Sequence, residues 1–99
     1  MKKKVYVTAK FTVKKENISD AIALMKGLTE TTTQTEAGCI AYYYLQNNAN
    51  ECEFTSYEIW EDESEEIKHW ETAHVQNALK ELPNLLETLP EIIKWSALN

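Results

Sequence analysis

Strict alternation of apolar and polar side chains marks the first predicted element, residues 5–13. One side carries Val5, Val7, Ala9, Phe11 and Val13, and the other carries Tyr6, Thr8, Lys10 and Thr12. Because successive side chains of a strand point to opposite faces, this pattern predicts a half-buried strand. Three more strands are predicted over residues 39–46, 52–60 and 92–98. The second places Ile40, Tyr42 and Tyr44 on one face, and the third places Phe54, Ser56, Glu58 and Trp60 on one face.

Helical spacing of apolar side chains separates the first two strands. Ile18, Ile22, Met25 and Leu28 form one apolar stripe, with Asn17 as its predicted N-cap and Gly38 as its stop. A second helix begins after the predicted cap Asp62, and we expect Ile67 and Trp70 to face the core. Residues 72–74 interrupt this helix, which restarts and runs through Leu82. Pro83 and Pro90 bracket a loop before the last strand.

The element order is therefore β-α-β-β-α-α-β. It predicts one α+β domain over residues 1–99 with the ferredoxin-like arrangement, an antiparallel sheet with helices on one face. The other face of the sheet would then expose aromatic side chains. A solvated aromatic face of that size is unusual, so we expect a second copy of the chain to cover it in a homodimer.

Charge and composition narrow the classes of partner that the protein could bind. The net charge is −6, made of +3 over residues 1–50 and −9 over residues 51–99, and the chain contains no Arg. This balance argues against nucleic acid, and the missing Arg weighs against phosphorylated ligands. Cys39 and Cys52 are expected to be free thiols. The start of the chain does not resemble a signal peptide and no membrane helix is expected, so we predict a cytoplasmic protein.

Several short motifs together resemble a known family. They are the GCIAY segment at residues 38–42, YEIW at residues 57–60, His69 nine residues after Trp60, His74 within TAH at residues 72–74, and the LP pairs at residues 82–83 and 89–90. The chain resembles the antibiotic biosynthesis monooxygenase (ABM) family of the dimeric α+β barrel superfamily. The resemblance implies a dimer of packed sheets with a ligand pocket between sheet and helices in each subunit.

The resemblance also implies a range of activities. Some members oxidise quinol- or anthrone-like aromatics with molecular oxygen and no cofactor, some degrade haem, and one isomerises a phosphorylated signal. The haem-degrading branch has an Asn in the first strand and a Trp and a His in the helices. The residues at the corresponding positions of this chain are Ala9, His69 and Leu79. We therefore expect no haem and no other cofactor.

The chain departs from the family at Glu66, where an apolar residue is usual and where Ile67 follows. A shift of one position rotates a helix face, so we expect His69 either to be exposed on the acidic side of its helix or to have a structural role. A place for His69 in the substrate pocket remains the alternative. His69 and His74 are five residues apart, which is not the spacing that puts two ligands on one helix face, so no metal site is predicted.

The predicted catalytic residues are His74 and Glu58. A neutral imidazole can take a phenolic proton, and a helix-start histidine bonded to its own backbone is the alternative for His74. Glu58 would be desolvated if its strand face is buried, which would raise its pKa; a structural hydrogen bond across the sheet is the alternative. The predicted substrate-binding residues are Trp60, Trp70, Tyr42, Tyr44 and His69, although aromatic residues at such spacings are often simply core.

These residues lead to a first hypothesis and two alternatives. The first is a cofactor-independent monooxygenase acting on a quinol- or anthrone-like small molecule with O2. The second is a non-catalytic dimer that binds a small molecule. The third is an isomerase of a small polar metabolite.

Overall fold

Four strands and three α-helices make up the computed structural model, which describes residues 3–99. In chain order they are β1 (Val5–Thr12), a short 3-10 turn η1 (Lys15–Asn17), α1 (Ile18–Thr35), β2 (Cys39–Gln46), β3 (Glu53–Trp60), α2 (Glu63–Trp70), α3 (Ala73–Leu85) and β4 (Glu91–Trp95). Met1 and Lys2, part of the start that does not resemble a signal peptide, lie outside the described residues.

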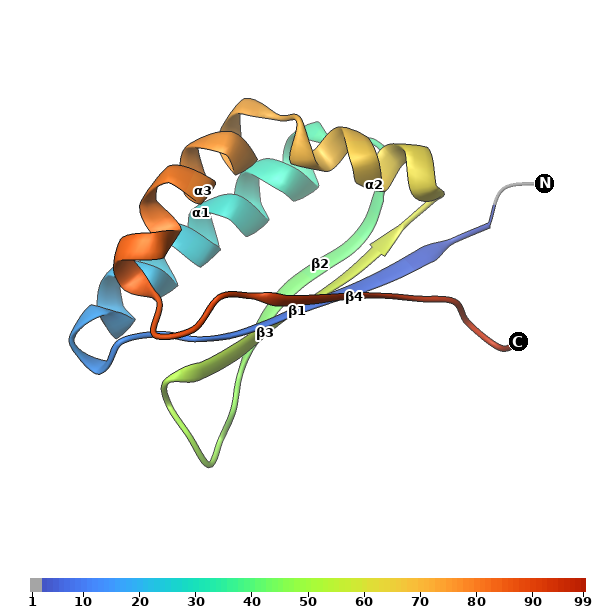
Figure 1. The fold of residues 1–99 in the computed structure, drawn as a ribbon. Coiled ribbons are helices and arrows are strands. Elements are labelled where there is room, and N and C mark those ends of the chain that lie inside the picture. The colour runs from blue at the N-terminus through green and yellow to red at the C-terminus, as the bar shows by residue number, and fades with distance from the viewer. Residues whose placement is uncertain (1–2) are drawn as a thin grey trace.

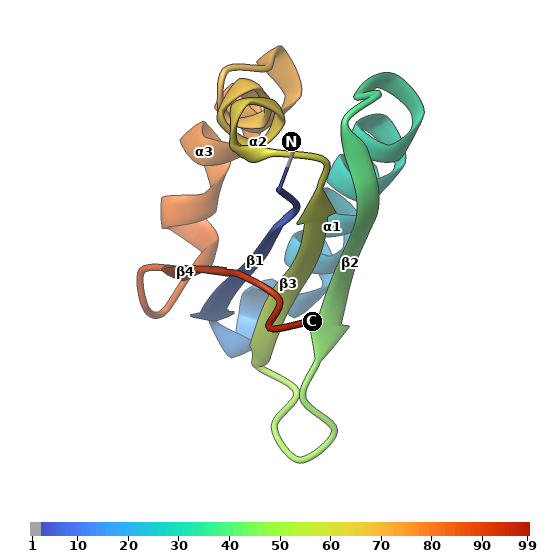
Figure 2. The same ribbon diagram turned by 90° about the vertical axis from the view of Figure 1, so that its right-hand side faces the viewer.

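The strands form one antiparallel sheet in the order β2-β3-β1-β4. All three helices lie on the same side of this sheet (Figure 1), and α1 and α3 run side by side along it (Figure 2). The order and the one-sided helices confirm the predicted ferredoxin-like α+β fold. None of the helices within residues 3–99 is long and apolar enough to cross a membrane.

The strand faces follow the predicted alternation with one exception. Val7 and Phe11 of β1 and Phe54 and Trp60 of β3 are buried beneath the helices. In β2, however, the register shifts between Cys39 and Ala41, so that Ile40 lies at a bulge and is 47% exposed. The prediction that Ile40 shares the inner face with Tyr42 and Tyr44 is therefore wrong, because a bulge adds one residue and breaks the alternation.

The opposite face of the sheet is rich in exposed aromatic side chains, as predicted. Tyr43, Tyr57 and Trp95 are 58%, 40% and 51% exposed. Tyr6 and Trp95 are cross-strand partners on this face. The aromatic surface is thus present in the single chain, and it is the surface that a second copy would have to cover.

Helix α2 faces the core with Trp70, as predicted, but not with Ile67. Glu66 and His69 are buried, whereas Ile67 is 47% exposed. Asp62 sets the start of the helix by accepting a hydrogen bond from the Glu65 amide at 3.0 Å, as predicted. With that start, the position usual for an apolar residue falls on Glu66, whose carboxylate accepts a hydrogen bond from Trp70 Nε1 at 2.6 Å and pairs with Lys94 at 2.8 Å.

The expectation of an exposed His69 is consequently wrong. The partners that Glu66 finds on Trp70 and Lys94 allow a carboxylate to occupy the buried position. Position 66 therefore faces the core in spite of its charge, and His69, three residues later on the same side of the helix, also faces inward.

Gly38 acts through close packing. It does not adopt a positive φ, so it is not a left-handed helix cap. A Cβ at this position would lie 2.5 Å from Cγ and 2.6 Å from Cβ of Glu65. The glycine thus lets the α1–β2 turn approach the first turn of α2.

Smaller differences occur at element ends. Asn17 occupies the N-cap position of α1 but makes no capping bond, and its side-chain amide donates to the Asn84 carbonyl at 3.3 Å. Helix α3 continues past Leu82 and includes Pro83. The Lys14 amide holds its last turn by donating to the Leu85 carbonyl at 2.9 Å. Strand β4 ends at Trp95, three residues before the predicted end. Both cysteines are free, as predicted.

Candidate functional site

A small, mainly apolar cavity of about 80 Å³ lies between the sheet and helices α1 and α3. Leu24 and Leu28 of α1, Val75 and Ala78 of α3, and Ile92 of β4 contribute apolar walls. The remaining lining includes Tyr42, Tyr44, Glu58, His69 and Trp70. Five of the seven residues predicted for the site therefore meet at one cavity, where a few polar groups converge in apolar surroundings, as is typical of ligand pockets.

A carboxylate that the sequence did not suggest joins the two histidines. Glu36, the residue that ends α1, places Oε2 at 2.8 Å from Nδ1 of His69 and at 2.7 Å from Nε2 of His74. His69 comes from the last turn of α2 and His74 from the first turn of α3. The break between these helices, where Thr72 caps α3 by accepting from the Val75 amide, brings both rings to the same carboxylate.

His69 is held by aromatic rings as well as by Glu36. Its ring lies 4.7 Å from that of Trp60 and 5.3 Å from that of Tyr42, measured between centroids, and the residue is 3% exposed. A carboxylate that accepts from Nδ1–H leaves Nε2 as the nitrogen with a free lone pair. His69 also lines the cavity, so this is an oriented histidine in the wall of a small cavity.

Glu58 occupies the buried inner face of β3. Ser56 Oγ donates to Oε2 at 2.7 Å, and Trp60 Nε1 donates to Oε1 at 3.1 Å. Burial raises the pKa of this carboxyl group, and the two hydrogen bonds only partly oppose that shift. The burial and the raised pKa agree with the expectation for this residue.

Two tyrosine hydroxyl groups form a pair at the same cavity. The hydroxyl oxygens of Tyr42 and Tyr44 lie 3.0 Å apart. Burial raises the pKa of Tyr42 and raises the pKa of Tyr44 to about 12. Both phenols therefore remain protonated at neutral pH, where they can hydrogen-bond a ligand but cannot act as bases.

Two of the predicted residues lie behind the cavity wall. Trp60 is completely buried, contacts the His69 ring and donates to Glu58, so it supports both groups from beneath. His74 is not among the lining residues, and its Nε2 is directed to Glu36. Glu36 and Ser56 were not predicted as site residues, because nothing in their local pattern distinguishes them from ordinary polar residues at element ends and in strands.

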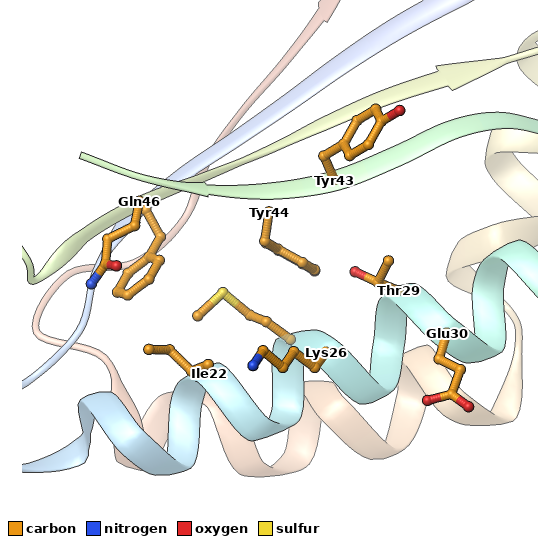
Figure 3. A pocket seen from close by; sticks show the side chains of 9 residues that line it. Ile22, Lys26, Thr29, Glu30, Tyr43, Tyr44 and Gln46 are labelled. Atoms are coloured by element: carbon orange, nitrogen blue, oxygen red, sulfur yellow. The ribbon is translucent and has the colours of Figure 1, made fainter. Parts of the chain in front are cut away.

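A larger and more open hollow of about 400 Å³ lies between α1 and β2. Tyr44 points from β2 toward α1 in this region, while Tyr43 lies on the opposite side of the strand (Figure 3). The charged residues that line this hollow are Lys26 and Glu30, and neither histidine lines it. We assign the candidate site to the smaller cavity, since that is where the oriented histidine and the buried carboxyl group meet.

Comparison with known families identifies the family of this chain. The model of the family described as "Antibiotic biosynthesis monooxygenase" matches residues 4–81. The chain belongs to this family. The match spans β1 through most of α3 and so includes Glu36, Glu58 and both histidines. Membership supports a monooxygenase-like role for this ABM-family chain.

Individual proteins resemble the chain in fold or in sequence. A conserved protein from Methanosarcina mazei Go1 is 31% identical with a TM-score of 0.89, over 95% of this chain and 92% of that one. Rv0793 from Mycobacterium tuberculosis, at 22% identity and a TM-score of 0.89 over 97% and 96% of the two chains, shares the fold. The "Uncharacterized protein sll1783" of Synechocystis is 25% identical over 88 residues, which are 89% of this chain and 59% of that protein.

Proposed function

We propose that this ABM-family chain is a cofactor-independent monooxygenase that oxidises a quinol- or anthrone-like small aromatic molecule with O2. The observation that carries the proposal is the Glu36–His69 hydrogen bond of 2.8 Å at the edge of an apolar cavity. A carboxylate on one imidazole nitrogen fixes the tautomer and prepares the other nitrogen to accept a proton. An oriented base beside an apolar space is what the deprotonation of a phenolic ring requires.

His69 is the better base of the two histidines. The sequence favoured His74, but the cavity is lined by His69 and not by His74. We therefore assign proton abstraction to His69 Nε2 and assign to His74 the role of orienting Glu36 through its 2.7 Å contact. In this assignment Trp60 keeps the His69 ring in place, and Trp70, Tyr42 and Tyr44 hold the substrate ring.

Glu58 and the tyrosine pair complete the proposed machinery. The raised pKa of Glu58 brings its protonation closer to neutral pH, which suits a group that exchanges protons with the substrate or with reduced oxygen. One tyrosine hydroxyl donates to the other, and the remaining O–H of the pair is available to donate a hydrogen bond to a substrate oxygen. The apolar wall excludes water from the reactive anion.

The substrate supplies the electrons in this scheme. Deprotonation gives an electron-rich anion that can reduce O2 directly. For an anthrone-like ring, one oxygen atom ends on the ring carbon as a carbonyl and the other leaves as water with the two hydrogens of the CH2 group. The protein needs only to bind the ring, remove the proton and hold the reactants together.

The size of the cavity favours the smaller substrates. At about 80 Å³ it is smaller than the cavity of roughly 150 Å³ that is known to accept benzene. Leu79 and Ile92, which are 40% and 45% exposed, form part of its wall and can move outward. A quinol with one or two rings requires less displacement than a tricyclic anthrone.

We also propose that the working form is a homodimer. The exposed aromatic face formed by Tyr43, Tyr57 and Trp95 supports this assembly, because contiguous apolar surface of that kind usually marks an interaction site.

Oxygen uptake with a panel of quinols and anthrones tests the proposal. Wild-type protein is expected to consume O2 above the uncatalysed rate, and His69→Gln should lower turnover by about 10²- to 10⁴-fold. Glu36→Gln should also lower turnover, because an amide can donate to Nδ1 and favour the other tautomer. Glu81→Gln, on the exposed side of α3, is the matched control and should behave as wild type.

Three outcomes would contradict the scheme. Wild-type turnover well above background that His69→Gln does not reduce would remove His69 from the chemistry. Binding of a ring without turnover would favour the non-catalytic binding protein, and conversion of a small metabolite without O2 uptake would favour the isomerase.

A further inference from the structure

Three potential metal ligands converge where α1 ends and α3 begins. Glu36 Oε2, a nitrogen of His69 and a nitrogen of His74 all lie within 4.8 Å of one another. The two histidines are the only ones in the chain. Their five-residue separation excludes a site on one continuous helix, but the break between α2 and α3 places them on two helices and removes that objection.

The geometry points to a metal site beyond the proposed oxygenase function. We propose that Glu36, His69 and His74 bind one divalent transition-metal ion such as Zn²⁺. Zinc takes imidazole nitrogen and carboxylate oxygen at about 2.0–2.2 Å in a tetrahedron, which places neighbouring ligand atoms about 3.3 Å apart. The observed separations from Glu36 Oε2, 2.7 and 2.8 Å, need to widen by about half an ångström. The two imidazole nitrogens, which lie within 4.8 Å of each other, must also settle at about 3.3 Å, and side-chain rotations can provide both changes.

The surroundings favour a cation at this position. The Glu36 side chain is 11% exposed, and among the described residues its ion-pair partners are the two imidazoles alone. A carboxylate at that depth that has no Lys partner within residues 3–99 gains from a positive ion. The contact of the His69 ring with Trp60 and the contact of Thr72 Oγ1 with His74 Nε2 at 3.3 Å hold the rings in place before an ion arrives.

The ligand set selects the class of ion. Two imidazoles and one carboxylate suit Zn²⁺ and other late first-row metals, whereas Mg²⁺ and Ca²⁺ prefer sites made of oxygen alone. Three protein ligands leave a fourth position for water.

Metal binding would change the hydrogen-bonding state of His69. The proton now on Nδ1 in the bond to Glu36 must leave that atom for an ion to bind there, and in a neutral ring it then resides on Nε2. If His69 Nε2 is the base of the proposed oxygenase, a bound ion would block it. This consequence rests on the proposed function, whereas the metal site does not.

Titration of the tag-free, metal-free chain with Co²⁺ and Zn²⁺ tests the site directly. Co²⁺ should produce the visible absorption of tetrahedral cobalt with one ion per chain, and Zn²⁺ should displace it while Mg²⁺ should not. Glu36→Gln and His74→Gln should each weaken Zn²⁺ binding by at least about 10- to 100-fold, the loss typical of disturbing even an outer-shell group. Circular dichroism of each variant without metal confirms that it is folded.

Two control variants separate this site from other donors. Cys39→Ser tests the nearby thiol, and Glu81→Gln tests the acidic surface of α3; both should bind Zn²⁺ as wild type does. Absence of a tetrahedral cobalt spectrum, or equal Zn²⁺ affinity in Glu36→Gln, His74→Gln and wild type, would overturn the proposal. Neither result depends on O2 uptake, so loss of the metal site would leave the oxygenase proposal standing.

Discussion

Replacement of Gly38 by Ala should destabilise the protein by steric conflict with α2. The added Cβ would lie 2.5, 2.6 and 2.7 Å from Cγ, Cβ and Cδ of Glu65. Carbon atoms pack best at about 3.5–4.0 Å, so each of these three contacts is about 1 Å too short. Since one of the three atoms is the Glu65 Cβ, rotation of the side chain cannot relieve the conflict, and the first turn of α2 must move.

The expected magnitude combines two opposing effects. Overpacking of this kind costs about 1–3 kcal/mol. Because φ at Gly38 is not positive, Ala can adopt the backbone conformation there. Ala also lowers the conformational entropy of the unfolded chain, which stabilises the folded state by about 0.4–1 kcal/mol. The net loss should be about 1–2 kcal/mol, which for a domain of this size lowers Tm by roughly 5–15 °C.

The other glycine of the chain, Gly27, provides the matched control. Gly27 lies within α1, and a Cβ there would meet nothing within 4 Å. Gly27→Ala should therefore stabilise the protein by about 0.5–1 kcal/mol through helix propensity. The same chemical change is thus expected to act in opposite directions at the two positions.

Urea and thermal unfolding of four proteins complete the test of Gly38. They are wild type, Gly38→Ala, Glu65→Gly and the double variant. Removal of all Glu65 side-chain atoms should abolish the conflict, so the double-mutant cycle should show a favourable coupling of at least about 0.5 kcal/mol. If Gly38→Ala is as stable as wild type, or if the two changes are additive, the contact between the α1–β2 turn and α2 does not constrain Gly38.

Three further predictions follow from the buried groups and the exposed sheet face. Because burial raises the pKa of Glu58, the folded state binds its proton more tightly than the unfolded state; stability should fall as pH rises from about 4 through the raised pKa. Urea unfolding should show that Glu58→Gln lacks this part of the pH dependence, and parallel curves would contradict the shift. Burial, helped by Glu36, raises the pKa of Cys39 to about 11, so in a Cys52→Ser variant the thiol should react with a disulfide reagent at pH 8 about 100-fold more slowly than free cysteine; an equal rate would show an accessible thiolate. Light scattering should give a dimer for wild type and the 11.4 kDa monomer for Tyr57→Lys, and a monomeric wild type would refute the proposed homodimer.

The local pattern of the sequence was sufficient for the elements and for most of their faces. Alternation with a period of two follows from strand geometry, so the burial of Val7, Phe11 and Trp60 could be predicted from their positions alone. The Asp62 cap could also be predicted from the local sequence, because its hydrogen-bond partner is the backbone amide three residues away. The burial of Glu58, and hence the direction of its pKa shift, followed from its place on the Phe54–Trp60 face.

Only the tertiary structure decided which groups meet at the candidate site. Glu36 lies 33 residues from His69 and 38 residues from His74, and three helix ends must pack together before they touch. The inward position of His69 depends on a buried Glu66 that is stabilised by Trp70 and by Lys94 from β4. Periodicity reports how a segment presents its own side chains, whereas such contacts depend on how separate segments pack, and that information is spread over the whole chain.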